Sequence, residues 1–177
     1  MSSGGGVIAG AQHLQGMPEP LTVSIGEFRL AAAPQRLAIH GLGSCVAVLL
    51  HDADARLSCL GHILLPEQRA EERHRPPGRF ASTAVPAMLE ALCAHGARRN
   101  RVVAKVVGGA QMFQYERPPD PRSVGNRNLE ATLTALGRLA IRVDAEDTGG
   151  THGRTVLVDA GSGRMEVRAL RVTVKVL

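Results

Sequence analysis

The sequence has few aromatic residues and no long apolar run. Aromatic residues make up 2% of the 177 residues and tryptophan is absent, so aliphatic side chains must build the core. No window approaches the roughly 18 consecutive apolar residues that a membrane helix needs. The first residues also lack the basic start and apolar centre of a signal peptide. We therefore expect a cytoplasmic protein without membrane insertion.

Lysine is also scarce, although the formal net charge is +5. Lys105 and Lys175 are the only lysines, so arginine supplies almost all of the positive charge. A nucleic-acid surface usually interleaves basic and aromatic residues or carries a known reading motif. The few aromatic residues here are scattered and no such motif is found. This composition disfavours nucleic-acid binding and favours solvated arginine faces or attraction to an acidic protein partner.

The three cysteines, Cys45, Cys59 and Cys93, form no Cys-x-x-Cys pair. An odd number of cysteines without an export signal indicates reduced thiols rather than a disulfide framework. No two Cys or His residues have the spacing of a zinc finger, so no metal site is expected.

The length predicts one domain with a sizeable core. Residues 1–20 are rich in Gly, Ser and Pro and are predicted to be a disordered leader, which leaves 21–177 as the folded domain. Branched and leucine-rich runs bounded by turns predict strands at 21–31, 36–40, 44–50, 58–65, 101–107, 141–147, 155–159 and 165–176. The first four of these are expected to be adjacent hairpin strands.

Two helices are predicted between these strands, at 82–95 and 126–139. In the first, apolar residues recur with helical spacing, Ser82 is the expected N-cap and Pro86 falls in the first turn. In the second, Leu129, Leu133 and Leu136 share one face. The order of elements predicts an α/β fold, a single-domain layered α/β sandwich with mixed, largely antiparallel sheets and two main helices.

Cys45 is the strongest candidate for chemistry because it follows the glycine-rich turn Gly41-Leu42-Gly43-Ser44. A thiol acts as a nucleophile when it is ionised, and backbone amides in such a turn can stabilise the negative charge. His62 lies in the next apolar run, which two neighbouring strands would bring close to Cys45. The alternatives are that Cys45 is a small buried hydrophobe and that His62 is a core histidine.

The remaining candidates are weaker. His40 and His152 are candidate neighbours of the site, whereas Cys59 and Cys93 are expected to be inert. Gly108-Gly109 lacks the ending of a phosphate-binding loop and the full spacing of a dinucleotide fingerprint.

Five segments together resemble the CheD family of bacterial chemoreceptor glutamine deamidases. They are GLGSCVAV at 41–48, GHILLP at 61–66, KVVGGAQMF at 105–113, GNRN at 125–128 and DTGG at 147–150. The resemblance runs in order from about residue 25 to residue 167.

This resemblance implies a cysteine hydrolase that converts receptor glutamine side chains to glutamate. The family's nucleophile falls on Cys45 and its base on His62. The family's third catalytic residue, a threonine six positions before the cysteine, is Ile39 in this sequence. His40, Ser44 or a backbone carbonyl would then have to orient the imidazole.

The implied chemistry is attack of a Cys45 thiolate on the amide carbon, with the oxyanion held by amides near Gly43, Ser44 and Cys45. No metal or organic cofactor is required, and glutamyl methyl esters would react through the same acyl intermediate. The loops that carry Gly108, Gly109, Gln111 and Asn126 are predicted to shape the substrate groove.

The expected partners are chemoreceptor cytoplasmic domains, and the expected state is a monomer. The main alternative is a weakly active or non-catalytic partner that regulates a CheC-type phosphatase of CheY-phosphate. A third hypothesis is a general cysteine amidase that acts on small amides.

Overall fold

The computed structural model describes residues 19–112, 122–169 and 174–177. Its strands form two five-stranded sheets. The first has the order β1-β3-β8-β9-β10 and comprises Leu21–Thr22, Arg36–Leu42, Arg154–Asp159, Met165–Ala169 and Lys175–Val176. The second has the order β2-β5-β4-β6-β7 and comprises Phe28–Ala32, Leu57–Ile63, Val46–Asp52, Val103–Gly108 and Arg142–Thr148.

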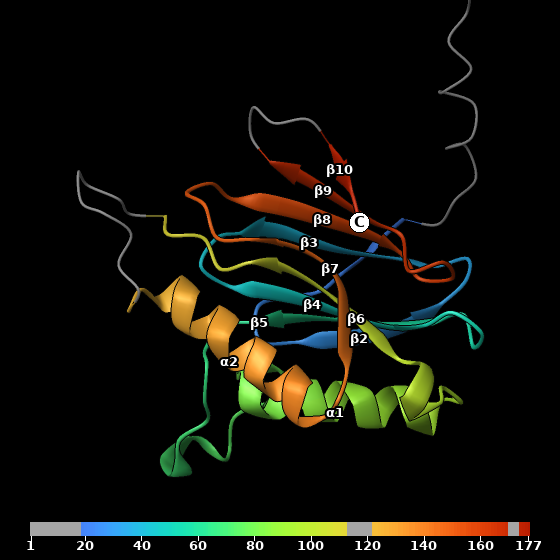
Figure 1. The fold of residues 1–177 in the computed structure, drawn as a ribbon, viewed down its shortest axis with the longest axis horizontal. Coiled ribbons are helices and arrows are strands. Elements are labelled where there is room, and N and C mark those ends of the chain that lie inside the picture. Colours follow the sequence, from blue (N-terminus) through green and yellow to red (C-terminus); the bar gives the residue numbers. More distant parts are fainter. Residues whose placement is uncertain (1–18, 113–121, 170–173) are drawn as a thin grey trace, which may run out of the picture.

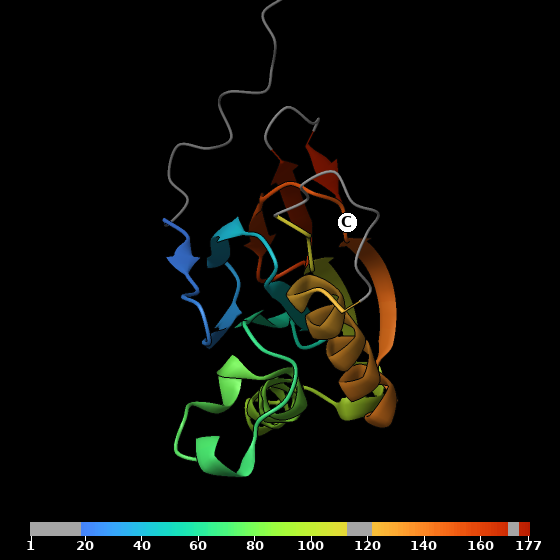
Figure 2. The same cartoon turned by 90° about the vertical axis from the view of Figure 1, so that its left-hand side faces the viewer.

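The molecule has three layers, with the second sheet in the middle (Figure 1). The first sheet covers one of its faces, and helices α1 (Ala81–Ala94) and α2 (Val124–Arg138) cover the other. Figure 2 shows α1 end-on beneath this sheet. Short 3-10 turns lie at Ala70–Glu72, Pro77–Arg79 and Arg99–Arg101.

Strand β4 lies at the centre of the middle sheet, and all seven of its residues are buried. Alternate side chains of a strand point to opposite faces. Val46, Val48 and Leu50 accordingly pack in the core beneath the helices, whereas Ala47 and Leu49 pack in the core between the sheets. The single-domain α/β sandwich with two main helices and largely antiparallel sheets is confirmed.

Several predicted elements were wrong in their detail. The strand predicted at 21–31 is two strands in different sheets, because a turn at Ser24–Glu27 redirects the chain after β1. Strands β3 and β4 follow each other in sequence but also lie in different sheets, so they are not a hairpin. The segment predicted as one strand at 165–176 contains β9 and β10, with 170–173 outside the described residues.

The helix details also differ from the prediction. Phe80, not Ser82, is the N-cap of α1, which moves Pro86 into the second turn. Leu133 is exposed, because the buried face of α2 runs through Gly125, Asn128, Thr132, Ala135 and Leu136 instead. Of the predicted leader 1–20, residues 1–18 lie outside the described part, so its disorder stays a prediction. No helix within the described ranges is both long and apolar enough to span a bilayer.

Asp52 at the end of β4 joins the β4–β5 hairpin to the segment after α1. Its buried carboxylate accepts hydrogen bonds from the Arg98 backbone N–H at 2.8 Å and from Arg101 Nη2 at 2.9 Å. The backbone N–H groups of Asp54 and Ala55 also donate to it. Burial by itself raises the pKa of a carboxyl, but these donors outweigh it and lower the pKa of Asp52 to about 2.

We predict that Asp52→Asn lowers the free energy of unfolding by about 2 kcal/mol at pH 7, because it removes charge-assisted hydrogen bonds in a buried site. The folded pKa lies below the ordinary value, so the carboxylate's contribution is present above about pH 4 and is lost as the pH falls toward 2. Urea denaturation at pH 7, 4 and 3 should show the difference from wild type shrinking with acidity.

Asp54→Asn is the matched control for Asp52→Asn. Asp54 also pairs with Arg101, at 3.1 Å, but its side chain is 72% exposed. An exposed ion pair contributes little, so this variant should unfold almost as wild type does. A deficit of Asp52→Asn that is the same at every pH would contradict the assignment.

Candidate active site

Cys45 lies at the end of the turn that joins β3 to β4, directly before Val46. Its side chain is 8% exposed and belongs to the core between the two sheets. Ala47 and Leu49, two and four residues further along, face the same core. The thiol therefore lies on the face of the middle sheet that is turned away from the helices.

His62 lies on β5, opposite Ala47 of β4. In this register Cys45 is the diagonal neighbour of His62 on the same face, a relation that places Cα atoms about 7–8 Å apart and side chains closer. His62 is 2% exposed. The structure thus brings the predicted nucleophile and base together on one face of one pair of strands.

The imidazole of His62 is oriented by a backbone carbonyl. Its Nδ1 lies 3.4 Å from the carbonyl oxygen of Val23, which follows β1. Because a carbonyl only accepts, this contact assigns the hydrogen to Nδ1 and leaves Nε2 as the basic nitrogen. Nε2 is buried and has no hydrogen-bond partner among the described residues.

Burial keeps both groups neutral. It lowers the pKa of His62, an effect that the Val23 carbonyl partly offsets, and it raises the pKa of the Cys45 thiol. At neutral pH both groups are therefore neutral, a thiol and an imidazole, and no hydrogen bond joins Nε2 of His62 to the thiol among the described residues. Cys59 is fully buried with its pKa raised to about 12, which suits an inert thiol, and Cys93 is an exposed residue of α1.

Three consecutive carbonyls of the turn before β4 are held by donors from later segments. Ala110 N–H donates to the Gly43 oxygen at 3.0 Å, and Gly109 N–H donates to the Cys45 oxygen at 2.9 Å. Between them, the Asn128 side chain donates to the Ser44 oxygen at 3.0 Å. The N–H groups of Ser44 and Cys45 donate to no acceptor within the described ranges. The turn is therefore fixed by its carbonyls, with two amides left as donors.

Gly108 and Gly109 allow these contacts. Gly108 has φ +115°, and a Cβ there would collide with the carbonyl oxygen of Cys45. Gly109 has φ +69° and packs against the backbone of Gly125 at the start of α2. Both glycines adopt backbone conformations that other residues resist. They lie against the turn that carries Cys45, and lining of a substrate groove stays a prediction for them.

The DTGG segment at 147–150 forms hydrogen bonds with the segment that carries Gly108 and Gly109. Gly149 N–H donates to the Gly108 oxygen at 2.9 Å, and Gln111 N–H donates to the Gly150 oxygen at 2.9 Å. Arg154 closes the loop by pairing with Asp147 at 3.3 Å and donating to the Gly149 oxygen at 2.9 Å.

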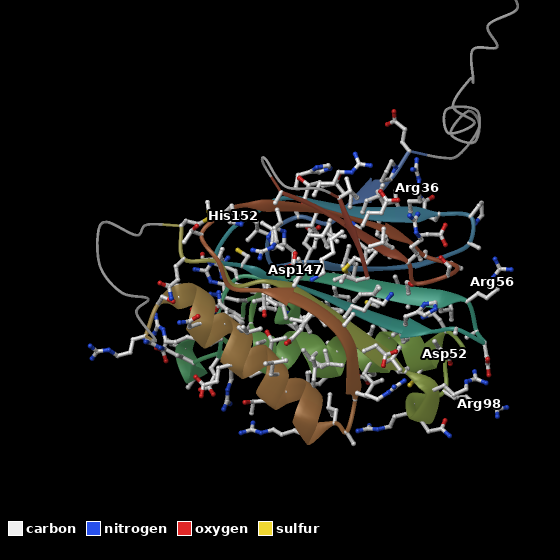
Figure 3. All side chains as sticks on the ribbon, turned by 45° about the horizontal axis from the view of Figure 1, so that its top comes forward. Arg36, Asp52, Arg56, Arg98, Asp147 and His152 are labelled. Carbon is white, nitrogen blue, oxygen red and sulfur yellow. The ribbon has the colours of Figure 1, made fainter. Side chains whose placement is uncertain are left out.

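Asn126 is partly buried at the third position of α2, where its N–H donates to the N-cap Ser123. His40 is exposed on β3, next to the buried Ile39, and His152 is exposed in the loop before β8. Figure 3 shows His152 and Asp52 at opposite ends of the molecule. The structure brings neither histidine into the buried site of Cys45.

Asn128 belongs to the GNRN segment of the sequence analysis, which did not single out its side chain or predict that it is buried beside the Cys45 turn. Leucine periodicity drew attention to the face of α2 that carries Leu133, which is exposed. The buried face of α2 could have been recognised from small and polar residues that lie three or four positions apart and share a face with Leu136. Asn128 and Thr132 belong to this face.

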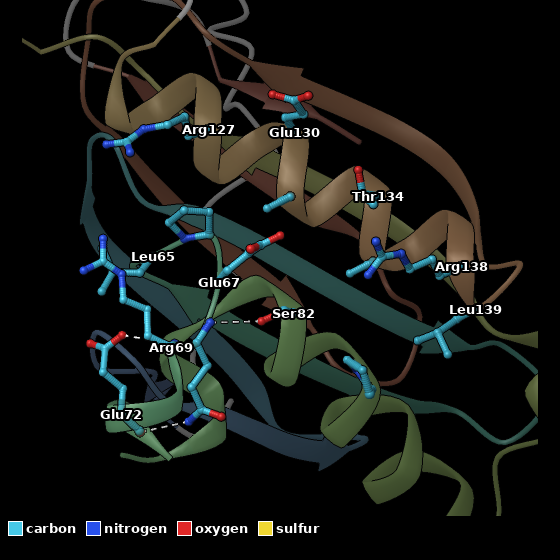
Figure 4. A pocket seen from close by; sticks show the side chains of 15 residues that line it. Leu65, Glu67, Arg69, Glu72, Ser82, Arg127, Glu130, Thr134, Arg138 and Leu139 are labelled. Carbon is cyan, nitrogen blue, oxygen red and sulfur yellow. Dashed lines mark hydrogen bonds between the residues drawn. The ribbon is translucent and has the colours of Figure 1, made fainter. Parts of the chain in front are cut away.

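A groove of about 1050 Å³ lies elsewhere, between α1, α2 and the segment after β5. Figure 4 shows its walls, with Arg127, Glu130, Thr134 and Arg138 on α2 and Glu67, Arg69 and Glu72 on the facing segment. It lies on the helical side of the middle sheet, whereas Cys45 faces the other sheet. Neither Cys45 nor His62 lines it.

Known proteins that resemble the chain agree on one family. The model of the CheD family, described as CheD chemotactic sensory transduction, matches residues 64–169. A probable chemoreceptor glutamine deamidase CheD of Moorella thermoacetica is 40% identical over 90% of this chain and 96% of its own.

Proteins of the same description give similar values in other organisms. The Methanococcus vannielii protein is 40% identical over 84% of this chain and 94% of its own. The Symbiobacterium thermophilum protein is 42% identical over 82% of this chain and 89% of its own. Because the alignments span most of both chains, and the five sequence segments meet around Cys45, the chain belongs to the CheD family.

Proposed function

We propose that this protein deamidates glutamine side chains of chemoreceptors through a thioester on Cys45. The observation that carries the proposal is the set of donors from Gly109, Ala110 and Asn128 on the turn before β4, with Cys45 and His62 on the same face beside it. The names of the relatives, chemoreceptor glutamine deamidases, supply the reaction and the substrate class. The site of action is the receptors' cytoplasmic region.

The reaction begins with transfer of the Cys45 proton to Nε2 of His62. The sulfur then forms a bond to the amide carbon of the glutamine side chain, and the N–H groups of Ser44 and Cys45 donate to the resulting oxyanion. His62 returns its proton to the nitrogen, which leaves as ammonia. Water next attacks the thioester while neutral His62 accepts a proton, and release of the carboxylate restores the thiol. A glutamyl methyl ester reacts in the same way, with methanol as the leaving group.

In this scheme the Val23 carbonyl takes the orienting role that the family resemblance assigns to a threonine at the position of Ile39. Ile39 is fully buried in the core that also contains Val23 and Cys45. Its side chain can neither donate nor accept a hydrogen bond, whereas the carbonyl accepts from Nδ1 of His62. The backbone thus supplies the function without a polar side chain.

The protein should convert glutamine to glutamate in a chemoreceptor cytoplasmic fragment, and peptide mass spectrometry should detect the mass gain at the modified residues. Cys45→Ala should abolish the gain, because no other thiol lies on this face of β4. His62→Gln should slow it by about 100-fold or more.

Cys93→Ser is the control for the loss of a thiol away from the site, and it should keep full activity. An unmodified receptor together with a stable complex with a CheC-type phosphatase would overturn the deamidase proposal in favour of the binding role. Equal activity on free glutamine would instead favour a general amidase.

Ile39→Thr tests what orients His62. Because the Val23 carbonyl already accepts from Nδ1, the added hydroxyl should not raise kcat. Burying the hydroxyl should lower the free energy of unfolding by about 2 kcal/mol, which thermal denaturation detects. Ile39→Val, which adds no hydroxyl, is the size control. A clear rise in kcat for the threonine variant alone would show that a side-chain partner is missing in the native protein.

A further inference from the structure

Asn128 is a buried polar residue of α2 whose side chain bridges two strands. Its Nδ2 donates to the Ser44 oxygen at 3.0 Å and to the Leu64 oxygen at 2.9 Å, and the residue is fully buried. We propose that Asn128 is a positioning residue that sets the alignment of Cys45 with His62 and the direction of the Cys45 N–H. Its effect on turnover rests on the proposed deamidase function, whereas its effect on the thiol does not.

The bridge lies where the direct pairing of β4 with β5 ends. The last paired residues are Val46 and Ile63. One step further, the Cys45 carbonyl accepts from Gly109, and the Leu64 N–H donates to the Arg79 carbonyl. The two strand ends therefore turn to different partners immediately beside the site. Asn128 Nδ2 joins the two strand ends again, because it binds the carbonyl of Ser44, one residue before Cys45, and that of Leu64, two residues after His62.

The chemistry of the carboxamide determines its orientation. Nδ2 carries two hydrogens, and the two carbonyl oxygens use both of them. The opposite orientation would place Oδ1 against two oxygens and leave all three buried acceptors unpaired. In the observed orientation Oδ1 is the only one of them without a partner among the described residues. A buried unpaired oxygen is unfavourable, which indicates a position selected for its two donors.

The backbone of Asn128 is itself held in place. Thr132 Oγ1 donates to the Asn128 carbonyl oxygen at 2.7 Å, and both residues are fully buried. At the start of the helix, Gly125 packs so closely on the carbonyls of Gly109 and Ala110 that a Cβ would overlap them. Helix α2 is therefore seated on the same segment that binds the Cys45 turn.

The bridge also determines where the Cys45 amide points. The C=O and N–H of a trans peptide unit point in opposite directions. Because the Ser44 oxygen is held toward α2, the N–H of Cys45 points away from the helix, and it has no acceptor within the described ranges. Loss of the Asn128 donors would let this peptide rotate and would misplace one of the two proposed oxyanion donors.

The test uses Asn128→Leu and Asn128→Asp, which keep the approximate size and remove the two donors. In the Cys93→Ser background, iodoacetamide alkylation of Cys45 is followed against pH, and kcat and KM are measured on a receptor fragment. We expect kcat to fall by about 100-fold in both variants, with KM little changed, because the reacting groups are misplaced. The pH dependence of alkylation should shift relative to the parent in both.

Two further variants keep the result decisive. Leu136→Ala removes buried apolar contacts of the same helix but leaves the bridge, so it should lose stability and keep the parent's kcat and alkylation profile. Asn128→Gln retains the carboxamide and should recover part of kcat if the leucine variant fails to fold.

Unchanged kcat and alkylation in folded Asn128→Asp or Asn128→Leu would overturn the proposal and leave Asn128 a structural residue. Losses of kcat and alkylation in Leu136→Ala equal to those in Asn128→Leu would overturn it as well, because general destabilisation of α2 would then explain both. If the parent shows no deamidation, the deamidase proposal fails, and the alkylation profile alone still decides the role of Asn128.

Discussion

Strands β4 and β5 pair with Ala47 opposite His62, and this register places Cys45 and His62 on one face of the sheet. A slip of one residue would turn His62 toward the helices and separate it from the thiol, since side chains alternate along a strand. The complete burial of β4 between two neighbouring strands and two apolar cores opposes such a slip. The other features of the site depend on this pairing, because they position the ends of these two strands.

Close backbone approach extends this control beyond the last paired residues. Glycines at 108, 109 and 125 let β6 and the start of α2 lie directly against the turn that precedes Cys45. Backbone donors from this segment and the carboxamide of Asn128 then take up three consecutive carbonyls of the turn. Side chains at these glycine positions would hold α2 and the segment after β6 away from the turn. The donors would then lie too far from the carbonyls of the turn to form hydrogen bonds. The glycines therefore matter through the contacts they permit.

Burial sets the electrostatics of the candidate site. It raises the pKa of the Cys45 thiol and lowers that of His62, so the unligated site favours two neutral groups. In the proposed reaction, proton transfer between them creates the thiolate only when a substrate and the backbone amides can stabilise the charge that follows. The Val23 carbonyl keeps the basic nitrogen of His62 available without adding a second ionisable group. In the proposed function, this backbone acceptor replaces the threonine that the family resemblance places at position 39.

Local patterns in the sequence predicted the α/β class and both helices, because these depend on short-range periodicity. They also made Cys45 and His62 candidates, and the family resemblance assigned their roles. The division of 21–31 between two sheets and the separation of β3 from β4 depend on which faces the distant strands cover. The two hydrogen bonds of Asn128 escaped prediction for the same reason, since its partners lie 84 and 64 residues away in sequence.

The sequence by itself thus determined which groups are the candidates for the reaction. The tertiary structure alone decided what binds beside them, the carboxamide of Asn128 at the Cys45 turn and the carbonyl of Val23 at His62, because hydrogen bonds to backbone atoms leave no mark on the residue types of their partners.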